Sequence, residues 1–409
     1  MLRLIYIITM AVAFTNYFNG ELMPFYVRYL ITIMWIVLWL IISRGKIKKE
    51  LVNNLKTYIL PFLMIGVWTL VVWAINPPAV LSHAFVSRMV SNILYLVLTY
   101  ACAAAGCDLF KRDVIKLSII SMVLSTVANI VVVVSSYDIS MFITYLTNAF
   151  STTDYDYGSP MELLARYLEV QDITMASGFY ILYFVLFNKE KKLKENLSWI
   201  LLACFCGYIG FKRTLLIGVL FVILLHFVLK SKRLGLKNLI YIIGIGYMIL
   251  SFAYVVMIDY GVLEVIAATT GINFMGRIGI YKILTTYIEI SPFFLGNGFC
   301  YVDKIMYEDI GFASHSVVIR MFAEIGCIPF FMWIYHYLIR VPNRYLKKYG
   351  KETAFVSFVL TVYMFITFFM ENTLSLFCVQ FSFFMIPLAI SYPPVERKRR
   401  SLLRMLGRR

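Results

Sequence analysis

Long apolar runs separated by short polar connections extend from the first residues to about position 391. The runs are about 16 to 24 residues long, the length that a helix needs to cross roughly 30 Å of hydrocarbon. They predict an all-α integral membrane protein with about twelve transmembrane helices, forming one polytopic domain over 1–409. The predicted spans are approximately 2–18, 25–43, 57–75, 84–105, 114–134, 173–188, 197–211, 214–230, 239–258, 315–339, 353–370 and 373–391.

Composition agrees with this pattern. The chain is 61% hydrophobic and 15% charged, with a mean hydropathy of +0.81, which excludes a soluble globular protein. The first residues resemble a signal peptide, but no small-residue cleavage site follows, so we expect a retained first helix.

The basic residues gather on alternate connections. Of 38 Lys and Arg residues, 29 lie in Arg3, the stretches 44–56, 111–116, 189–194, 230–237 and 340–351, and the tail. The positive-inside rule therefore predicts cytoplasmic N and C termini. The basic tail, 392–409, is expected to anchor the chain at the lipid surface and not to bind nucleic acid.

Metal and cofactor chemistry has little support. The seven cysteines include no C-x-x-C pair, and most lie inside spans, where cysteine acts as a small apolar residue. Asp154 and Asp156 form an acidic pair in an outer loop, which we interpret as solvated. We expect no metal and no cofactor.

Two outer connections are long, at about 135–172 and 259–314. In the first, Ser159-Pro160-Met161-Glu162 is a capping-box pattern, and Met161, Leu164 and Leu168 follow at helical spacing. They predict a short amphipathic helix on the outer leaflet. In the second, Ile280, Ile283, Leu284 and Tyr287 form an apolar stripe after Arg277 while Lys282 faces away, and Gly296-Asn297-Gly298 predicts a tight turn.

Nine basic residues lie outside the stretches predicted to be cytoplasmic, and each of these positions needs a local explanation. We expect Arg28 and Lys304 to reach the interface by snorkelling, and Arg320 to pair with Glu324 one turn away. Lys212 and Arg213 precede a helix, whose N-terminus already carries partial positive charge. A bound anion would remove that conflict, although a lipid headgroup would serve as well as a substrate.

His315 follows Ser314, which we expect to be the N-cap of the next helix. The positive helix end disfavours the imidazolium, so the ring should stay neutral near pH 7. A neutral imidazole facing outward can accept a proton from a hydroxyl. A single histidine at a membrane interface more often has a structural role, but the residues near His315 favour a catalytic one.

These residues form a spaced pattern that resembles the large outer loop and following helix of the O-antigen polymerase and O-antigen ligase family. The likeness covers about 205–331, through Gly276-Arg277-x-x-x-Tyr281, Ser291-Pro292, Leu295-Gly296-Asn297-Gly298, Ser314-His315-Ser316 and Glu324-Ile325-Gly326. Lys212-Arg213-Thr214 resembles the family's Ser-Arg pair. Lys212 stands where that family usually has Ser, and Ser316 where Asn is frequent.

The resemblance implies a polymerase that joins polyprenyl-diphosphate-linked repeat units outside a bacterial cytoplasmic membrane, for a capsular or O-antigen-type polysaccharide. The implied reaction is a metal-independent, inverting glycosyl transfer. His315 is the expected base, and Arg213 and Arg277 stabilise the leaving diphosphate. The residues expected to bind or orient the reactants are Arg166, Lys212, Lys282, Tyr281 and Glu371, with Glu371 orienting His315. Membrane lipid, a flippase and a chain-length regulator are the expected partners.

Three alternatives stay open at this point. A ligase of the same family would pass a finished glycan to another acceptor. A flippase or other transporter would line a path with cations in the middle of its spans. The last alternative is a membrane protein without catalytic activity that anchors a synthesis complex.

Overall fold

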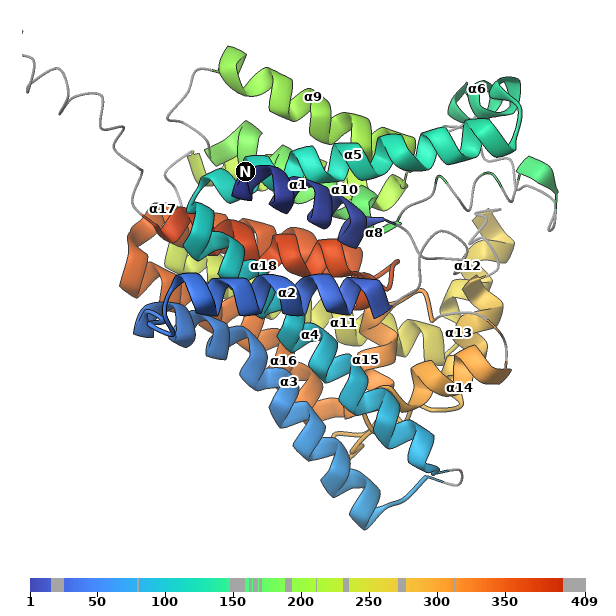
Figure 1. Ribbon diagram of the computed structural model, residues 1–409. Helices are drawn as coiled ribbons and strands as arrows, with labels where there is room; N and C mark the ends of the chain where they lie inside the picture. Colours follow the sequence, from blue (N-terminus) through green and yellow to red (C-terminus); the bar gives the residue numbers. More distant parts are fainter. Residues whose placement is uncertain are drawn as a thin grey trace, which may run out of the picture.

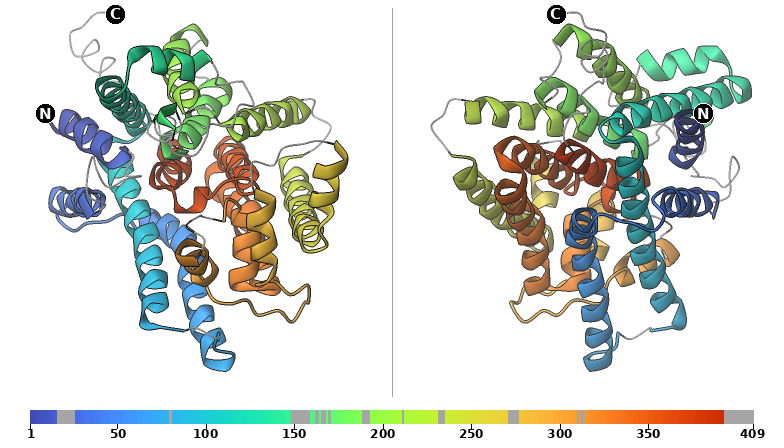
Figure 2. Two further views of the ribbon diagram at one scale, coloured as in Figure 1. Left: turned by 90° about the vertical axis from the view of Figure 1, so that its right-hand side faces the viewer. Right: turned by 60° about the vertical axis from the view of Figure 1, so that its left-hand side comes forward.

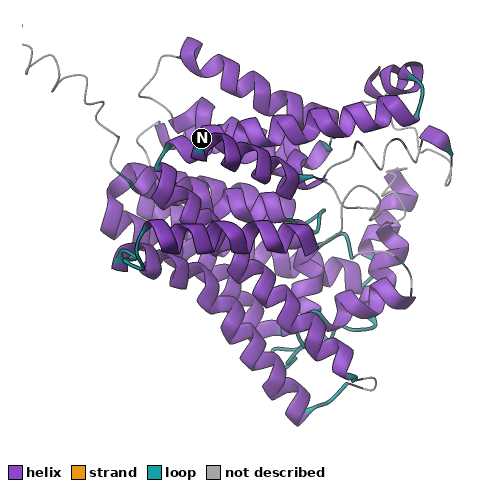
Figure 3. Ribbon diagram, viewed as in Figure 1, coloured by secondary structure: helices purple, strands orange, loops and turns teal. Residues whose placement is uncertain are grey.

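The computed structural model describes residues 1–15, 26–78, 81–147, 159–161, 164, 168, 171–187, 193–210, 212–230, 235–270, 277–309, 311 and 314–392. These residues form helices and loops, with no strand among them (Figures 1 and 3). The predicted Arg166, Asp154, Asp156 and Gly276 and the basic tail lie outside the described residues.

Every predicted span coincides with a helix or a pair of helices. The helices at the predicted spans are α1 (Leu2–Phe14), α2 (Tyr26–Ile42), α3 (Lys49–Ile75), α4 (His83–Phe110), α5 (Asp113–Ser136), α8 (Gln171–Leu182) with η2 (Tyr183–Phe187), α9 (Leu193–Ile209), α10 (Arg213–Lys230), α11 (Leu236–Asp259), α15 (Val317–Ile325), α16 (Cys327–Tyr335) with η3 (His336–Arg340), α17 (Val341–Thr367) and α18 (Phe377–Ser391). Shorter elements are α6 (Ile139–Thr147), α12 (Val262–Thr270), α13 (Arg277–Thr285), α14 (Tyr301–Asp309) and η4 (Thr373–Ser375).

Four of the described helices are, by length and composition, long and apolar enough to cross a membrane: α3, α4, α5 and α11. Six more are apolar but shorter. The predicted span 315–339 is two helices and not one, because Gly326 between α15 and α16 has a φ of +79° and ends the first helix. The chain is thus an all-α protein whose apolar helices suit a membrane.

Helix α18 lies at the centre. Every residue from Phe377 to Ala389 is buried, and the helix packs on α4, α5, α8 and α17 (Figure 2). A helix that is apolar on all sides belongs in the core of a bundle. Large exposed apolar side chains lie instead on the outer helices, for example Leu220, Phe227 and Ile249.

The two ends of the bundle differ. At one end the basic connections pair with carboxylates on neighbouring helices, as in Arg3 with Asp113 at 2.7 Å and Lys348 with Glu50 at 3.1 Å. The short helices α12, α13 and α14 lie together at the other end, on the right of Figure 1, and α6 lies at the same end beside α5. The site residues belong to this second end.

Arg28 does not snorkel to an interface as predicted. Its side chain is buried, lies 3.7 Å from Asp172 and donates to the carbonyl oxygen of Ala13 at the end of α1. Asp172 in turn accepts the backbone N–H of Cys378 at 2.6 Å and so caps α18. The pair therefore joins the ends of two helices inside the protein, with Arg28 also over the ring of Phe377.

The apolar stripe of the first outer loop faces protein and not the outer leaflet. Leu164 and Leu168 are fully buried against Val133 and Tyr145, and Met161 packs beside them. Apolar side chains at helical spacing lose contact with water equally well in lipid or in protein, so the sequence pattern cannot distinguish the two.

The Gly296-Asn297-Gly298 turn docks on the break after α15. Both glycines have positive φ, and a Cβ on Gly296 would lie 2.5 Å from the carbonyl oxygen of Glu324. The Asn297 amide donates to the carbonyl oxygens of Tyr287 and Ala323. The predicted tight turn is confirmed, and its close approach explains why glycine is needed.

Candidate functional site

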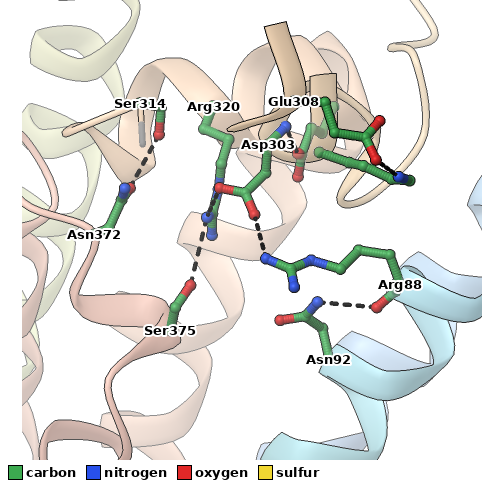
Figure 4. A network of polar contacts seen from close by, with 10 residues as sticks. Arg88, Asn92, Asp303, Glu308, Ser314, Arg320, Asn372 and Ser375 are labelled. Atoms are coloured by element: carbon green, nitrogen blue, oxygen red, sulfur yellow. Dashed lines mark hydrogen bonds and ion pairs between the residues drawn. The ribbon is translucent and has the colours of Figure 1, made fainter. Parts of the chain in front are cut away.

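The short segment 368–372, between α17 and η4, contacts the residues on both sides of His315 and also Arg277. The carbonyl oxygen of Phe368 accepts the Ser316 hydroxyl at 3.3 Å and the Val318 N–H at 3.2 Å. The side chain of Asn372 accepts the Ser314 hydroxyl at 3.0 Å (Figure 4). The sequence singled out only Glu371 in this segment, but the whole segment fixes the backbone on both sides of His315.

The same segment holds Arg277. This residue begins α13, and its Nη2 lies 3.6 Å from Oε1 of Glu371, whose side chain is buried. The Nη1 group points to the sulfur of Met370 at 3.4 Å. We expected Glu371 to orient His315; in the structure its carboxylate accompanies Arg277 and limits where the guanidinium can lie.

Tyr281 lies one turn after Arg277, on the buried side of α13. Its hydroxyl is 3.3 Å from that of Tyr254 on α11, which also donates to the carbonyl oxygen of Phe369. Burial raises the pKa of Tyr281, so the phenol stays protonated and acts as a hydrogen-bonding group. Tyr281 thus helps to hold α13 against the 368–372 segment.

His315 precedes α15 with a backbone φ of +49°, a left-handed conformation that is uncommon for residues other than glycine, although Asn, Asp and His adopt it more often than the rest. The N-cap of α15 is Ser316 and not Ser314 as predicted, because the Ser316 oxygen accepts the N–H of Ile319. Ser314 and Ser316 are fully buried and hydrogen-bonded. These two anchors keep His315 in its strained position.

The ring of His315 is neutral at physiological pH. Burial, followed by the positive charges of Arg277 and Lys212, lowers the pKa of His315 from its ordinary value of 6.5 to about 4. The prediction of a neutral imidazole agrees with this direction, but the cause differs. We predicted that the positive end of the following helix would lower the pKa, whereas burial and two cations lower it. Three separate stretches of chain, 212, 277 and 315, therefore act on one another electrostatically.

We expect histidine NMR to show this lowered pKa directly. The chain has four histidines, and His315→Asn would assign the resonance of His315. It should titrate near pH 4, and Lys212→Gln should raise its pKa by removing one cation. Because the unfolded chain takes up the proton at a higher pH, the stabilisation from this group should be complete above about pH 6.5 and be lost as pH falls towards about 4. Titration near 6.5 in the unaltered protein would contradict the geometry.

Lys212 and Arg213 lie where the sequence placed them, at the start of α10, where the Leu215 N–H bonds to the Lys212 carbonyl oxygen. Lys212 is half-buried and acts on His315, whereas the side chain of Arg213 is exposed. We predicted the stronger role for Arg213, whereas of the two residues it is Lys212 whose charge lowers the pKa of His315. Both stay at a helix N-terminus that suits an anion.

Among the described residues that we predicted for the site, Lys282 agrees least with a role in binding the reactants. Its side chain is 74% exposed, and its ion pair, at 4.0 Å, is with Glu264 on α12. On α13 it lies next to the buried Tyr281, and successive residues of a helix face different directions. The charge is on the surface of the end that carries α12 and α13, apart from the buried group around Arg277.

A second polar network lies beside the site (Figure 4). Arg320 was expected to pair with Glu324, but its Nη1 binds Oδ1 of Asp303 at 3.0 Å, and the Arg88 guanidinium reaches the other oxygen at 3.4 Å. Glu324 instead accepts the backbone N–H of Asp303. Asp303 on α14 was missed because its partners are distant in sequence. Lys304, the second residue expected to snorkel, pairs with Glu308.

No family model matches this chain, and no curated protein matches it. The assignment of a function therefore depends on the residues themselves and on their geometry.

Proposed function

We propose that this chain is a polymerase of polyprenyl-diphosphate-linked oligosaccharide repeat units, acting at the outer face of the bacterial cytoplasmic membrane. The observation that carries the proposal is His315, neutral at physiological pH and close enough to Arg277 and Lys212 for both to lower its pKa. A neutral base beside two cations matches the needs of a transfer in which a hydroxyl attacks and a diphosphate leaves.

In the proposed reaction, the acceptor sugar hydroxyl gives its proton to the imidazole of His315 as its oxygen attacks the anomeric carbon of the donor. The bond from that carbon to the diphosphate oxygen breaks, and the electron pair leaves with the diphosphate. Arg277 and Lys212, with Arg213 at the mouth of the site, stabilise the growing negative charge. One displacement inverts the anomeric configuration, and the proton then passes from His315 to solvent.

The lowered pKa of His315 fits a base that becomes effective when the donor binds. A pKa of about 4 makes the free imidazole a weak base. A bound diphosphate offsets the charges of Arg277 and Lys212, and therefore raises the basicity of His315 when the donor is present. Strong proton transfer is then confined to the complex with substrate.

The proposed topology has twelve spans, both termini in the cytoplasm and the site facing outward. Its support is the contrast between the two ends: the basic connections pair at one end, while His315 and Arg277 lie at the other. A polybasic end belongs on the cytoplasmic side.

A transporter is the main rival from another class, and two buried arginines count against it. Arg28 lies against Asp172 and Arg320 against Asp303, so each already has a carboxylate beside it within the protein. A transport path for an anionic lipid would instead need cations available to the cargo. A ligase would use the same groups on a different acceptor, and only the product distinguishes it.

The test in cells uses His315→Asn and Arg277→Lys, which preserve the left-handed backbone and the positive charge respectively. We expect polymer to disappear while single repeat units remain on lipid outside the cell. His83→Asn, at an exposed position at the start of α4, is the control and should give normal chain lengths. Lipid-linked units that accumulate facing the cytoplasm would support the transporter instead, and loss of a finished glycan from its acceptor with polymer intact would support the ligase.

A further inference from the structure

An apolar groove runs along the side of the bundle between α3 and α16, with a volume of about 1010 Å³. Its walls include Leu60, Met64 and Val71 of α3, Ile328 and Met332 of α16, and Phe293 of the preceding loop. Several of these large side chains are exposed, including Phe293 at 84% and Ile328 at 60%. None of the groups around His315 lines the groove, so it is separate from the proposed catalytic site.

Polar contacts tie α3 to the chain before α16 and to the chain after it. At one end the indole N–H of Trp68 donates to the carbonyl oxygens of Leu295 and Ile325, both at 3.1 Å. At the other, the ring of His336 bonds to the carbonyl oxygen of Thr57 at 2.8 Å. Because α3 is bonded to the chain on either side of α16, the groove between these helices is preformed, and a preformed pocket binds a ligand at lower entropic cost than a flexible surface.

The groove has a cationic end. Arg340 lines it, and Lys56 lies one helical turn before Leu60 on α3. Both side chains are exposed, and neither forms a hydrogen bond or ion pair within the described residues. From Ile328 to Arg340 the helix rises about 18 Å, a little more than half of the roughly 30 Å hydrocarbon thickness.

We propose that this groove binds one phospholipid with an anionic headgroup, from the leaflet at the basic end of the protein. Its acyl chains lie along the apolar walls of α3 and α16, and its phosphate lies between Lys56 and Arg340. The charges select the occupant: a zwitterionic lipid fills the apolar walls equally well but gains less from two cations. The length of one leaflet and the cationic end together match such a lipid.

Native mass spectrometry of the full-length protein tests this, after equilibration with equal amounts of phosphatidylglycerol and phosphatidylcholine that carry the same chains. We expect one retained phosphatidylglycerol in clear excess. The Lys56→Gln/Arg340→Gln variant should lose this preference, by about fivefold for each cation removed. Met332→Trp, which fills the groove at an exposed position, should reduce retention of both lipids.

The matched control is Arg44→Gln/Lys351→Gln, which removes one arginine and one lysine from exposed positions that do not line the groove. It should bind phosphatidylglycerol as the unaltered protein does. Equal retention of the two lipids would overturn the proposal, as would equal losses in the control and the groove variant. A second copy of the chain in place of lipid, released by Met332→Trp, would also overturn it and identify the face as a dimer interface.

Discussion

Replacing His315 with Asn should lower the maximal rate of polymer elongation by about 10²- to 10⁴-fold, the usual contribution of a general base. Asparagine tolerates the left-handed backbone that His315 adopts at a φ of +49°. It cannot accept the proton. Because a base acts in the transition state, the rate constant should fall while the KM for the donor changes little.

His83→Asn is the matched control for this variant, because it makes the same exchange on an exposed residue of α4. We expect its rate to stay within about twofold of the unaltered protein, as is usual for a surface exchange of small energetic effect. If His315→Asn raised the KM alone and left the rate constant unchanged, the imidazole would be a binding group and not a base.

Replacing Arg28 with Ala should destabilise the protein by about 3–5 kcal/mol, because Asp172 is then left buried without its cation. The same change removes the hydrogen bonds from Arg28 to the carbonyl oxygens of Ala13 and Thr15. Thermal unfolding of the detergent-purified protein should show a large fall in Tm. Arg28→Met combined with Asp172→Asn should recover much of it, since the amide oxygen of Asn can still cap α18.

Arg3→Ala is the control for this effect. The ion pair of Arg3 with Asp113 is shorter, at 2.7 Å, but the two side chains are 65% and 49% exposed. Exposed pairs contribute about 0–1 kcal/mol, so the Tm should change little. An equal loss of stability in Arg3→Ala and Arg28→Ala would show that burial of the Arg28 pair carries no special cost.

The helices could be predicted because the apolar runs have the length and composition of helices that cross hydrocarbon, where backbone groups must be hydrogen-bonded within the segment. Gly296 and Gly298 were also predictable, since a glycine pair around an asparagine specifies a tight turn. Apolar periodicity, however, does not identify the surface it faces. This is why Leu164 and Leu168 were expected on lipid and are found against Val133 and Tyr145.

The partners of buried charges could not be predicted. The spacing of four residues predicted that Arg320 pairs with Glu324. In the structure the carboxylate that forms the ion pair is that of Asp303, on another helix. In the same way, the pair of Arg28 with Asp172 joins residues far apart in the chain. Pairing across helices depends on their packing, which local pattern does not contain.

The importance of the 368–372 segment also came only from the structure. Its sequence has no motif, because it acts partly through the backbone carbonyl groups of Phe368 and Phe369. Any residue supplies such a group. The opposite charges of Arg277 and Glu371 are compatible with a pair, but their positions in the sequence do not show that they meet.

The most direct test of the account is elongation by the purified protein in liposomes that contain only polyprenyl-diphosphate-linked repeat units. The account predicts a ladder of lengthening glycans with the unaltered chain, no added metal being needed, and single units with His315→Asn. A ladder of equal length from His315→Asn, or single units from the unaltered chain under conditions where it is folded, would contradict it.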